Sequence, residues 1–139
     1  MHAHRRAGTS TSSVEYRLDR DPVSAGRARR LTAAFLARVH GSGAEVNAEA
    51  VDDVTLVVSE LVANATEHGR GGCRLRLESS AHRVTVEVQD DGPGRPRPGV
   101  QRASGERGRG LSLVRRLAER FEVEAAAGGG KTVRAIVAG

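Results

Sequence analysis

Two oxygen-bearing side chains that could serve phosphoryl chemistry stand four residues apart in the middle of the chain. Glu60 and Asn64 lie in a segment predicted to be helical over residues 48–68, so they project from one face, and His68 follows one turn later. A carboxylate beside an amide oxygen can ligate Mg²⁺, a hard cation that prefers oxygen. The ordinary alternative is a solvated helix face with an i,i+4 pair of no chemical role.

A glycine-rich turn at residues 90–94 follows directly on a predicted strand. Asp-Gly and Pro-Gly are common turn dipeptides, so this segment could be a turn and nothing more. The other interpretation uses the chemistry of its residues. A carboxylate at a strand end can accept a hydrogen from the amino group of a base, and Gly92 and Gly94 let the backbone approach a flat ligand. On that interpretation Asp90 recognises adenine.

A second glycine pattern, Gly108-Arg109-Gly110-Leu111, opens a short predicted helix. Glycines at such a position expose backbone amides at the positive end of the helix dipole, an arrangement that binds phosphate. The pattern is also compatible with glycines that simply end a flexible loop.

The elements that must position these residues can be read from the spacing of apolar and turn residues. Alternating apolar residues predict strands, apolar residues at helical spacing predict helices, and Asn47 is a predicted helix cap. The long Pro/Gly/Arg-rich segment that starts at residue 90 predicts a mobile loop, with a lid over residues 95–107. Local pairing of strands favours a two-layer α/β (α+β) sandwich, with a mixed, mainly antiparallel sheet and helices on one face. The expected order is a strand at 14–18, helices from 21–22 to 41 and over 48–68, a hairpin at 73–77 and 84–88, a helix at 111–121, and a hairpin at 121–125 and 132–138.

Composition limits the chemistry further. The chain has 139 residues, which suits one domain, predicted over residues 13–139 behind a flexible tail at 1–12. Its single cysteine, Cys73, excludes a disulfide framework and a cysteine-based zinc site, and the five histidines show no metal spacing. Gly130-Lys131-Thr132 is similar to the end of a P-loop, but Ala125 stands where the first glycine should be. A strand also follows where a P-loop needs a helix.

The net charge of +5 is almost entirely due to arginine, because Lys131 is the only lysine. A basic chain favours anionic ligands without distinguishing nucleotides, nucleic acids and acidic proteins. No basic face interleaved with aromatic residues and no recognition-helix motif is visible, so we expect no direct contact with nucleic acid. No segment is apolar enough to cross a membrane, and we expect a cytoplasmic protein.

Taken in order, these motifs resemble the boxes of the histidine-kinase-like ATPase superfamily (the GHKL or Bergerat fold). The segments are 60–65, 90–94, 108–111 and 130–132. With a short lid and no attached domain, the chain is most similar to bacterial anti-sigma regulatory factor serine/threonine kinases. The resemblance covers about residue 14 to the end.

The resemblance implies bound ATP and Mg²⁺. Asn64 would ligate the metal, Glu60 would act as general base, and Asp90 would bind the adenine amino group. His68, one turn beyond Asn64, joins the predicted cofactor-binding set. By the same resemblance Gly92 and Gly94 form the floor of the base pocket, Gly108, Gly110 and Leu111 cradle the phosphates, Arg109 approaches the anionic end of ATP, and Thr132 lies near adenine.

The function that the resemblance implies is phosphorylation of a protein antagonist, alternating with sequestration of a sigma factor. A homodimer is compatible with it. The alternative from another class is a nucleotide-gated module that masks a protein partner without kinase activity. Retention of Glu60 favours the kinase, because a base is needed to take the proton of the accepting hydroxyl.

Overall fold

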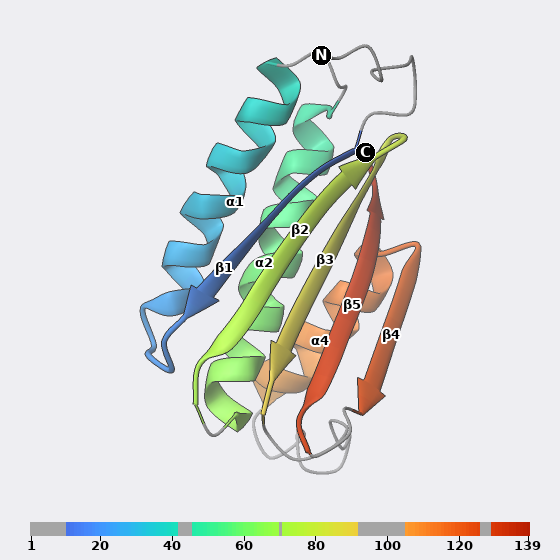
Figure 1. Ribbon diagram of the computed structural model, residues 1–139. Helices are drawn as coiled ribbons and strands as arrows, with labels where there is room; N and C mark the ends of the chain where they lie inside the picture. Colours follow the sequence, from blue (N-terminus) through green and yellow to red (C-terminus); the bar gives the residue numbers. More distant parts are fainter. Residues whose placement is uncertain (1–10, 42–45, 70, 92–104, 126–128) are drawn as a thin grey trace.

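The structure, a computed structural model, describes residues 11–41, 46–69, 71–91, 105–125 and 129–139. Within them, five strands form one sheet in the order β1-β2-β3-β5-β4, and three helices cover one of its faces (Figure 1). The elements are β1 (Thr11–Leu18), α1 (Ser24–Gly41), α2 (Ala48–His68), β2 (Cys73–Ser80), β3 (Arg83–Asp90), α4 (Gly105–Leu117), β4 (Arg120–Ala125) and β5 (Lys131–Ala138).

The predicted two-layer α/β sandwich is confirmed. Every pair of neighbouring strands in the described sheet is antiparallel. β1 pairs Thr11 and Ser12 with β2, so the sheet starts two residues before the predicted domain boundary at residue 13. The rest of the predicted tail, and the predicted lid up to residue 104, lie outside the described residues.

The inner face of the sheet is built mainly from small branched residues. Strands β2, β3 and β5 alternate between buried and half-buried positions, as period-2 geometry requires. Fully burying one valine or leucine contributes about 1.5–3 kcal/mol, so a core without tryptophan is still sufficient. The buried apolar residues of these three strands are Cys73, Leu75, Leu77, Val84, Val86, Val88, Val133, Ala135 and Val137.

Helix α2 has the bounds that the sequence predicts, because both ends carry caps. The side chain of Asn47 accepts a hydrogen bond from the amide of Ala50 at 2.7 Å, and the amide of Gly69 donates to the carbonyl of Ala65 at 2.7 Å. Its buried face is broader than the predicted stripe. Val57 and Val62 are fully buried, so the helix packs against both α1 and the sheet.

Helix α1 starts at Ser24, later than the predicted start at Asp21-Pro22. Asp21 acts in the turn before it: its Oδ1 accepts from the amide of Val23, and its carbonyl accepts from the amide of Ser24, both at 2.9 Å. Buried Phe35 and Leu36 then fix the helix on α2.

Helix α4 differs most from the prediction. It covers Gly105–Leu117 rather than 111–121, so it starts within the segment predicted to be a loop, and Phe121 belongs to β4. Glycine lowers helix propensity, but packing against α2 and burial of Val114 favour the helix. It ends where β4 must begin, since Arg120 pairs with Ile136 of β5.

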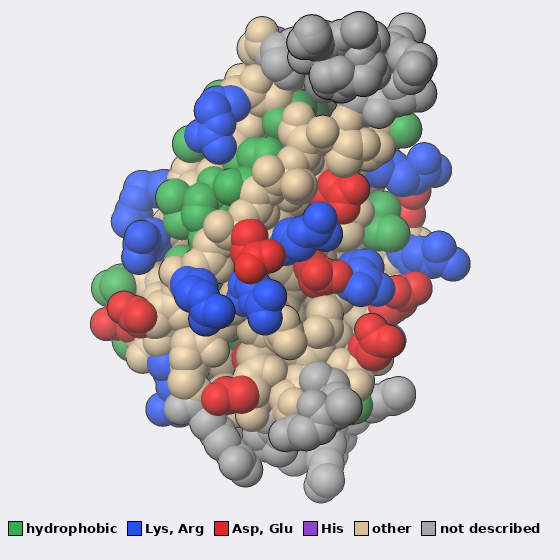
Figure 2. All heavy atoms as spheres, in the orientation of Figure 1, with side chains coloured by type: hydrophobic (Ala, Val, Ile, Leu, Met, Phe, Trp, Pro, Cys, Tyr) green, Lys and Arg blue, Asp and Glu red, His purple; other side chains and the backbone are tan. Residues whose placement is uncertain are grey.

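The outer face of the sheet carries charges in place of helices (Figure 2). Arg134 of β5 contacts acidic residues on both neighbouring strands: its Nη2 is 2.7 Å from Glu87, and its Nη1 is 3.0 Å from Glu122. The hydrogen bond to Glu87 is the main reason that the pKa of Arg134 is raised above its ordinary value. One row of register partners alternates in sign across all five strands: Glu15, Arg76, Glu87, Arg134 and Glu122.

The β2–β3 turn offers a stability prediction. Ala81 and His82 form a two-residue loop with φ of 49° and 64°, a region that costs a non-glycine residue about 1–2 kcal/mol. We expect His82→Gly to raise the free energy of unfolding by about 0.5–1 kcal/mol, after the greater unfolded-state freedom of glycine is subtracted. Urea denaturation measures it. Ala34→Gly, inside α1, is the matched control and should lower stability by about 1 kcal/mol.

Candidate functional site

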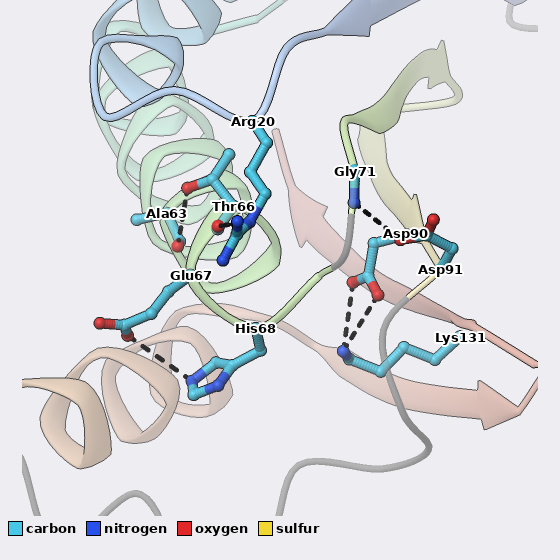
Figure 3. Close-up of polar contacts among 9 residues, drawn as sticks. All are labelled: Arg20, Ala63, Thr66, Glu67, His68, Gly71, Asp90, Asp91 and Lys131. Atoms are coloured by element: carbon cyan, nitrogen blue, oxygen red, sulfur yellow. Dashed lines mark hydrogen bonds and ion pairs between the residues drawn. The ribbon is translucent and has the colours of Figure 1, made fainter.

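Two of the predicted site residues, His68 and Asp90, lie where the C-terminal end of α2 meets the end of β3 and the start of β5 (Figure 3). His68 ends α2, while Asp90 and Lys131 are direct register partners on β3 and β5. The structure therefore brings Asp90, which is 22 residues beyond His68 in sequence, to the same end of the molecule.

Asn64 is buried, with 5% of its surface exposed. It does not lie on a solvated helix face, which corrects the ordinary interpretation of its spacing from Glu60. Its Oδ1 has no hydrogen-bond partner within the described part of the chain. A buried amide oxygen without a partner costs about 1–3 kcal/mol, so native proteins rarely keep one without a reason.

Glu60 lies one helical turn before Asn64 and is half-buried. Among the described residues, no ion pair or hydrogen bond engages its carboxylate. The Glu60 carboxylate is therefore available to a group that approaches this face of α2.

His68 is half-buried at the end of the same helix. Its Nε2 is 3.6 Å from Oε1 of Glu67, which is too long for a hydrogen bond, and this nitrogen is buried without a hydrogen-bond partner in the described structure (Figure 3). Two polar atoms on consecutive turns of α2, Asn64 Oδ1 and His68 Nε2, thus have no hydrogen-bond partner among the described residues.

Asp90 is held in a buried ion pair that the sequence analysis missed. The Nζ of Lys131 lies 3.1 Å from Oδ2 and 3.3 Å from Oδ1 of Asp90, and the side chains of Lys131 and Asp90 are 2% and 1% exposed (Figure 3). A signal for it exists in the sequence. Lys131 is in phase with the apolar residues Val133, Ala135 and Val137, which mark the inner face of β5.

Thr132 is not brought together with Asp90. It follows Lys131 on β5 and pairs with Gln89, so its side chain leaves the opposite face of the sheet. The predicted strand starts at Thr132, one residue too late, and so leaves out the residue that contacts Asp90.

Two further residues, Asp91 and Cys73, lie next to Asp90. Oδ1 of Asp91 accepts a hydrogen bond from the amide of Gly71 at 3.1 Å, which joins the end of β3 to the turn before β2. Cys73 is the register partner of Asp90. Burial first, and the Asp90 charge second, raise the pKa of Cys73 to about 11, so its sulfur stays a protonated thiol at neutral pH.

Close packing at this corner depends on Gly130, which gives a second prediction. Gly130 has a φ of +87°, and a Cβ there would lie 2.5 Å from the carbonyl oxygen of Asp90, whereas Gly129, at φ +102°, has open space. We expect Gly129→Ala to cost about 1–2 kcal/mol through backbone strain. Gly130→Ala should cost at least about 1 kcal/mol more, because the strands must also separate. Denaturant titration of both variants measures the difference, and equal losses would contradict the close contact.

The remaining predicted site residues belong to the two glycine-rich motifs. Gly92 and Gly94 lie outside the described residues. Gly108, Arg109, Gly110 and Leu111 lie inside α4, whose first residue is Gly105, so they do not open the helix as predicted. Only the first four amides of a helix lack an internal partner, and Gly108 is the last of those four.

The fold and the order of these residues define the class of protein. The family model of the histidine kinase-like ATPase domain matches residues 18–137, and the chain belongs to this family. Membership of this family implies a nucleotide-binding domain. No curated protein sequence matches the chain significantly.

Among solved structures, the chain is similar to the crystal structure of the RsbU and RsbW domains of Rv1364c from Mycobacterium tuberculosis. The TM-score is 0.66 at 19% sequence identity. The match covers 91% of this chain and 32% of that one, so the chain spans about a third of the length of the crystallised chain. At this identity the similarity concerns the fold. None of the helices in the described ranges is long and apolar enough to span a membrane.

Proposed function

We propose that this chain binds ATP with Mg²⁺ and acts as a serine/threonine protein kinase of the anti-sigma regulatory type. The observation that carries the proposal is the buried, unpartnered Oδ1 of Asn64, one helical turn from Glu60. Phosphoryl transfer requires positioning and charge stabilisation more than covalent chemistry by the protein, and these residue types supply both.

The described residues offer Mg²⁺ one protein ligand, the side-chain oxygen of Asn64. The described residues contain no group of three or more His, Cys, Asp or Glu side chains that could hold a metal ion. Asn64 Oδ1 would be a single protein ligand, and Mg²⁺ commonly takes its other ligands from phosphates and water. Bound there, the metal would neutralise charge on the phosphates.

Each of the other residues has one proposed task. Glu60 takes the proton of the accepting hydroxyl, His68 contacts the nucleotide, and Asp90 accepts the amino hydrogen of adenine. The remaining proposed contacts are the glycine floor at Gly92 and Gly94 and the phosphate contacts at Gly108, Arg109, Gly110 and Leu111.

The proposed partners are proteins: a sigma factor and a phosphorylated antagonist, met in the cytoplasm, with a homodimer as the assembly. The motif resemblance supports this class of partner. The test recovers proteins that co-purify with the chain in Mg·ATP and in Mg·ADP, then adds radiolabelled ATP to wild type and each partner. Transfer of label to a serine or threonine is the expected result. If wild type binds both ATP and a partner yet labels nothing, the kinase is excluded and nucleotide-gated partner binding remains.

A further inference from the structure

We propose that Lys131 competes with the nucleotide base for the Asp90 carboxylate, and so sets the affinity of the nucleotide site. The inference rests on the proposed function, in which the amino group of adenine reaches Asp90. It gives a role to Lys131, which lies within the 130–132 motif but has no role in the sequence analysis.

The geometry leaves little of the carboxylate open. One ammonium group lies within 3.3 Å of both Asp90 oxygens, and both side chains are almost completely buried. A carboxylate has about four lone-pair positions, and an ammonium between the oxygens takes the two that face it. An adenine amino group that approaches from that side must displace Nζ.

The two donors are not equal. Both donors would make charge-assisted hydrogen bonds, because the Asp90 carboxylate is charged, but only the ammonium of Lys131 adds the attraction between two opposite charges. Separating a buried ion pair also leaves a charge without its partner, which is costly unless Nζ reaches water or phosphate. Binding of the base therefore includes the free-energy cost of moving Lys131.

The surrounding residues keep Lys131 in place. Gly130, directly before it, packs its α-carbon against the backbone of Asp90, and Lys131 and Asp90 are opposite each other in the register. The side chain leaves the strand on the inner face, beside the apolar residues that follow it. Cys73, across from Asp90 on β2, is a neutral thiol and does not replace the cation.

Mg·ATP affinity of Lys131→Ala and Lys131→Met tests the competition. Calorimetry should find ATP bound at least about 10-fold more tightly than by wild type, the size expected for one charge-assisted bond. Arg134→Ala is the matched control, since it removes a cation from the same strand but on the outer face, where Arg134 pairs with Glu87. It should change affinity by no more than about twofold.

Purine riboside triphosphate lacks the amino group of adenine. Its affinity therefore shows whether the Lys131 variants bind ATP more tightly through Asp90 or bind every nucleotide more tightly. The Lys131 variants should bind ATP more tightly but gain clearly less for this analogue. Circular dichroism and denaturation show whether the variants fold. The inference is wrong if the folded variants bind ATP with unchanged affinity, or if their affinities for ATP and for the analogue rise equally. In either case, ATP binding by wild type would leave the proposed function intact. No ATP binding by wild type or by the variants would overturn both.

A measurement on wild type avoids any folding defect. Because Lys131 is the only lysine, acetylation by an amine-reactive ester, read by peptide mass spectrometry, reports on this residue alone. We expect slow acetylation without nucleotide and faster acetylation in saturating Mg·ATP, as Nζ leaves Asp90. An equal or lower rate with bound ATP would contradict displacement of the lysine.

Discussion

Glu60→Gln should retain ATP binding within a few-fold and reduce phosphotransfer to the protein partner by about 10²–10⁴. The substitution keeps the size of the side chain and nearly the same helix propensity, so α2 should be unchanged. A neutral amide can still hydrogen-bond in the pocket, but it cannot take the proton of the hydroxyl as the phosphoryl group is transferred. Calorimetry measures binding, and transfer of radiolabel from ATP measures the chemistry.

Glu49→Gln is the control for this experiment. Glu49 is an exposed residue in the first turn of the same helix, and its substitution removes the same charge at the other end of α2. Phosphotransfer by this variant should match wild type. If Glu60→Gln transfers phosphate as fast as wild type does, Glu60 is not the general base.

The second large effect is expected at Asn64. Asn64→Ala removes the buried Oδ1, and we expect the affinity for Mg·ATP to fall by about 10- to 100-fold. The loss should be specific to the metal, so affinity for ATP in EDTA should change little. Calorimetry with and without Mg²⁺ makes the comparison, and circular dichroism checks the fold.

Asn64→Asp is the informative companion to Asn64→Ala. It keeps an oxygen in the same place, so it should retain most of the Mg²⁺-dependent binding, although a buried carboxylate is costly without the metal. If Asn64→Ala binds Mg·ATP as wild type does, the metal assignment is wrong.

Local signals explain why parts of the fold could be predicted. Helix α2 has a cap at Asn47, a long apolar period and a terminal glycine, and both of its bounds are correct. Helix α4 could not be placed in the same way, because Gly105, Gly108 and Gly110 give no local preference for a helix. Its start depends on packing against α2, and packing partners are not visible in a single sequence.

The site was predicted in part for a similar reason. Spacing along α2 places Glu60 and Asn64 on one side of the helix, but the burial of Asn64 depends on what covers it. The ion pair between Asp90 and Lys131 joins residues 41 positions apart through the register of β3 and β5. The predicted last strand starts at Thr132, so Lys131 falls in the preceding loop and its pairing with Asp90 is not predicted.

The alternating charges on the outer face of the sheet help to determine how the strands line up. The apolar positions on the inner faces of β3 and β5 are mostly valine, so sliding one strand by two residues would keep these side chains inside, and on that face the slide is opposed mainly by loss of the Asp90–Lys131 ion pair. The same slide would move Arg134 away from Glu87, to a position opposite Thr85 or Gln89. Each pair of opposite charges directly across two strands stabilises the sheet by about 0.2–1 kcal/mol, and the shifted alignment loses this stabilisation. The solvent-facing ion pairs thus act together with the buried pair between Asp90 and Lys131 to select one alignment among several that the valine positions alone would accept.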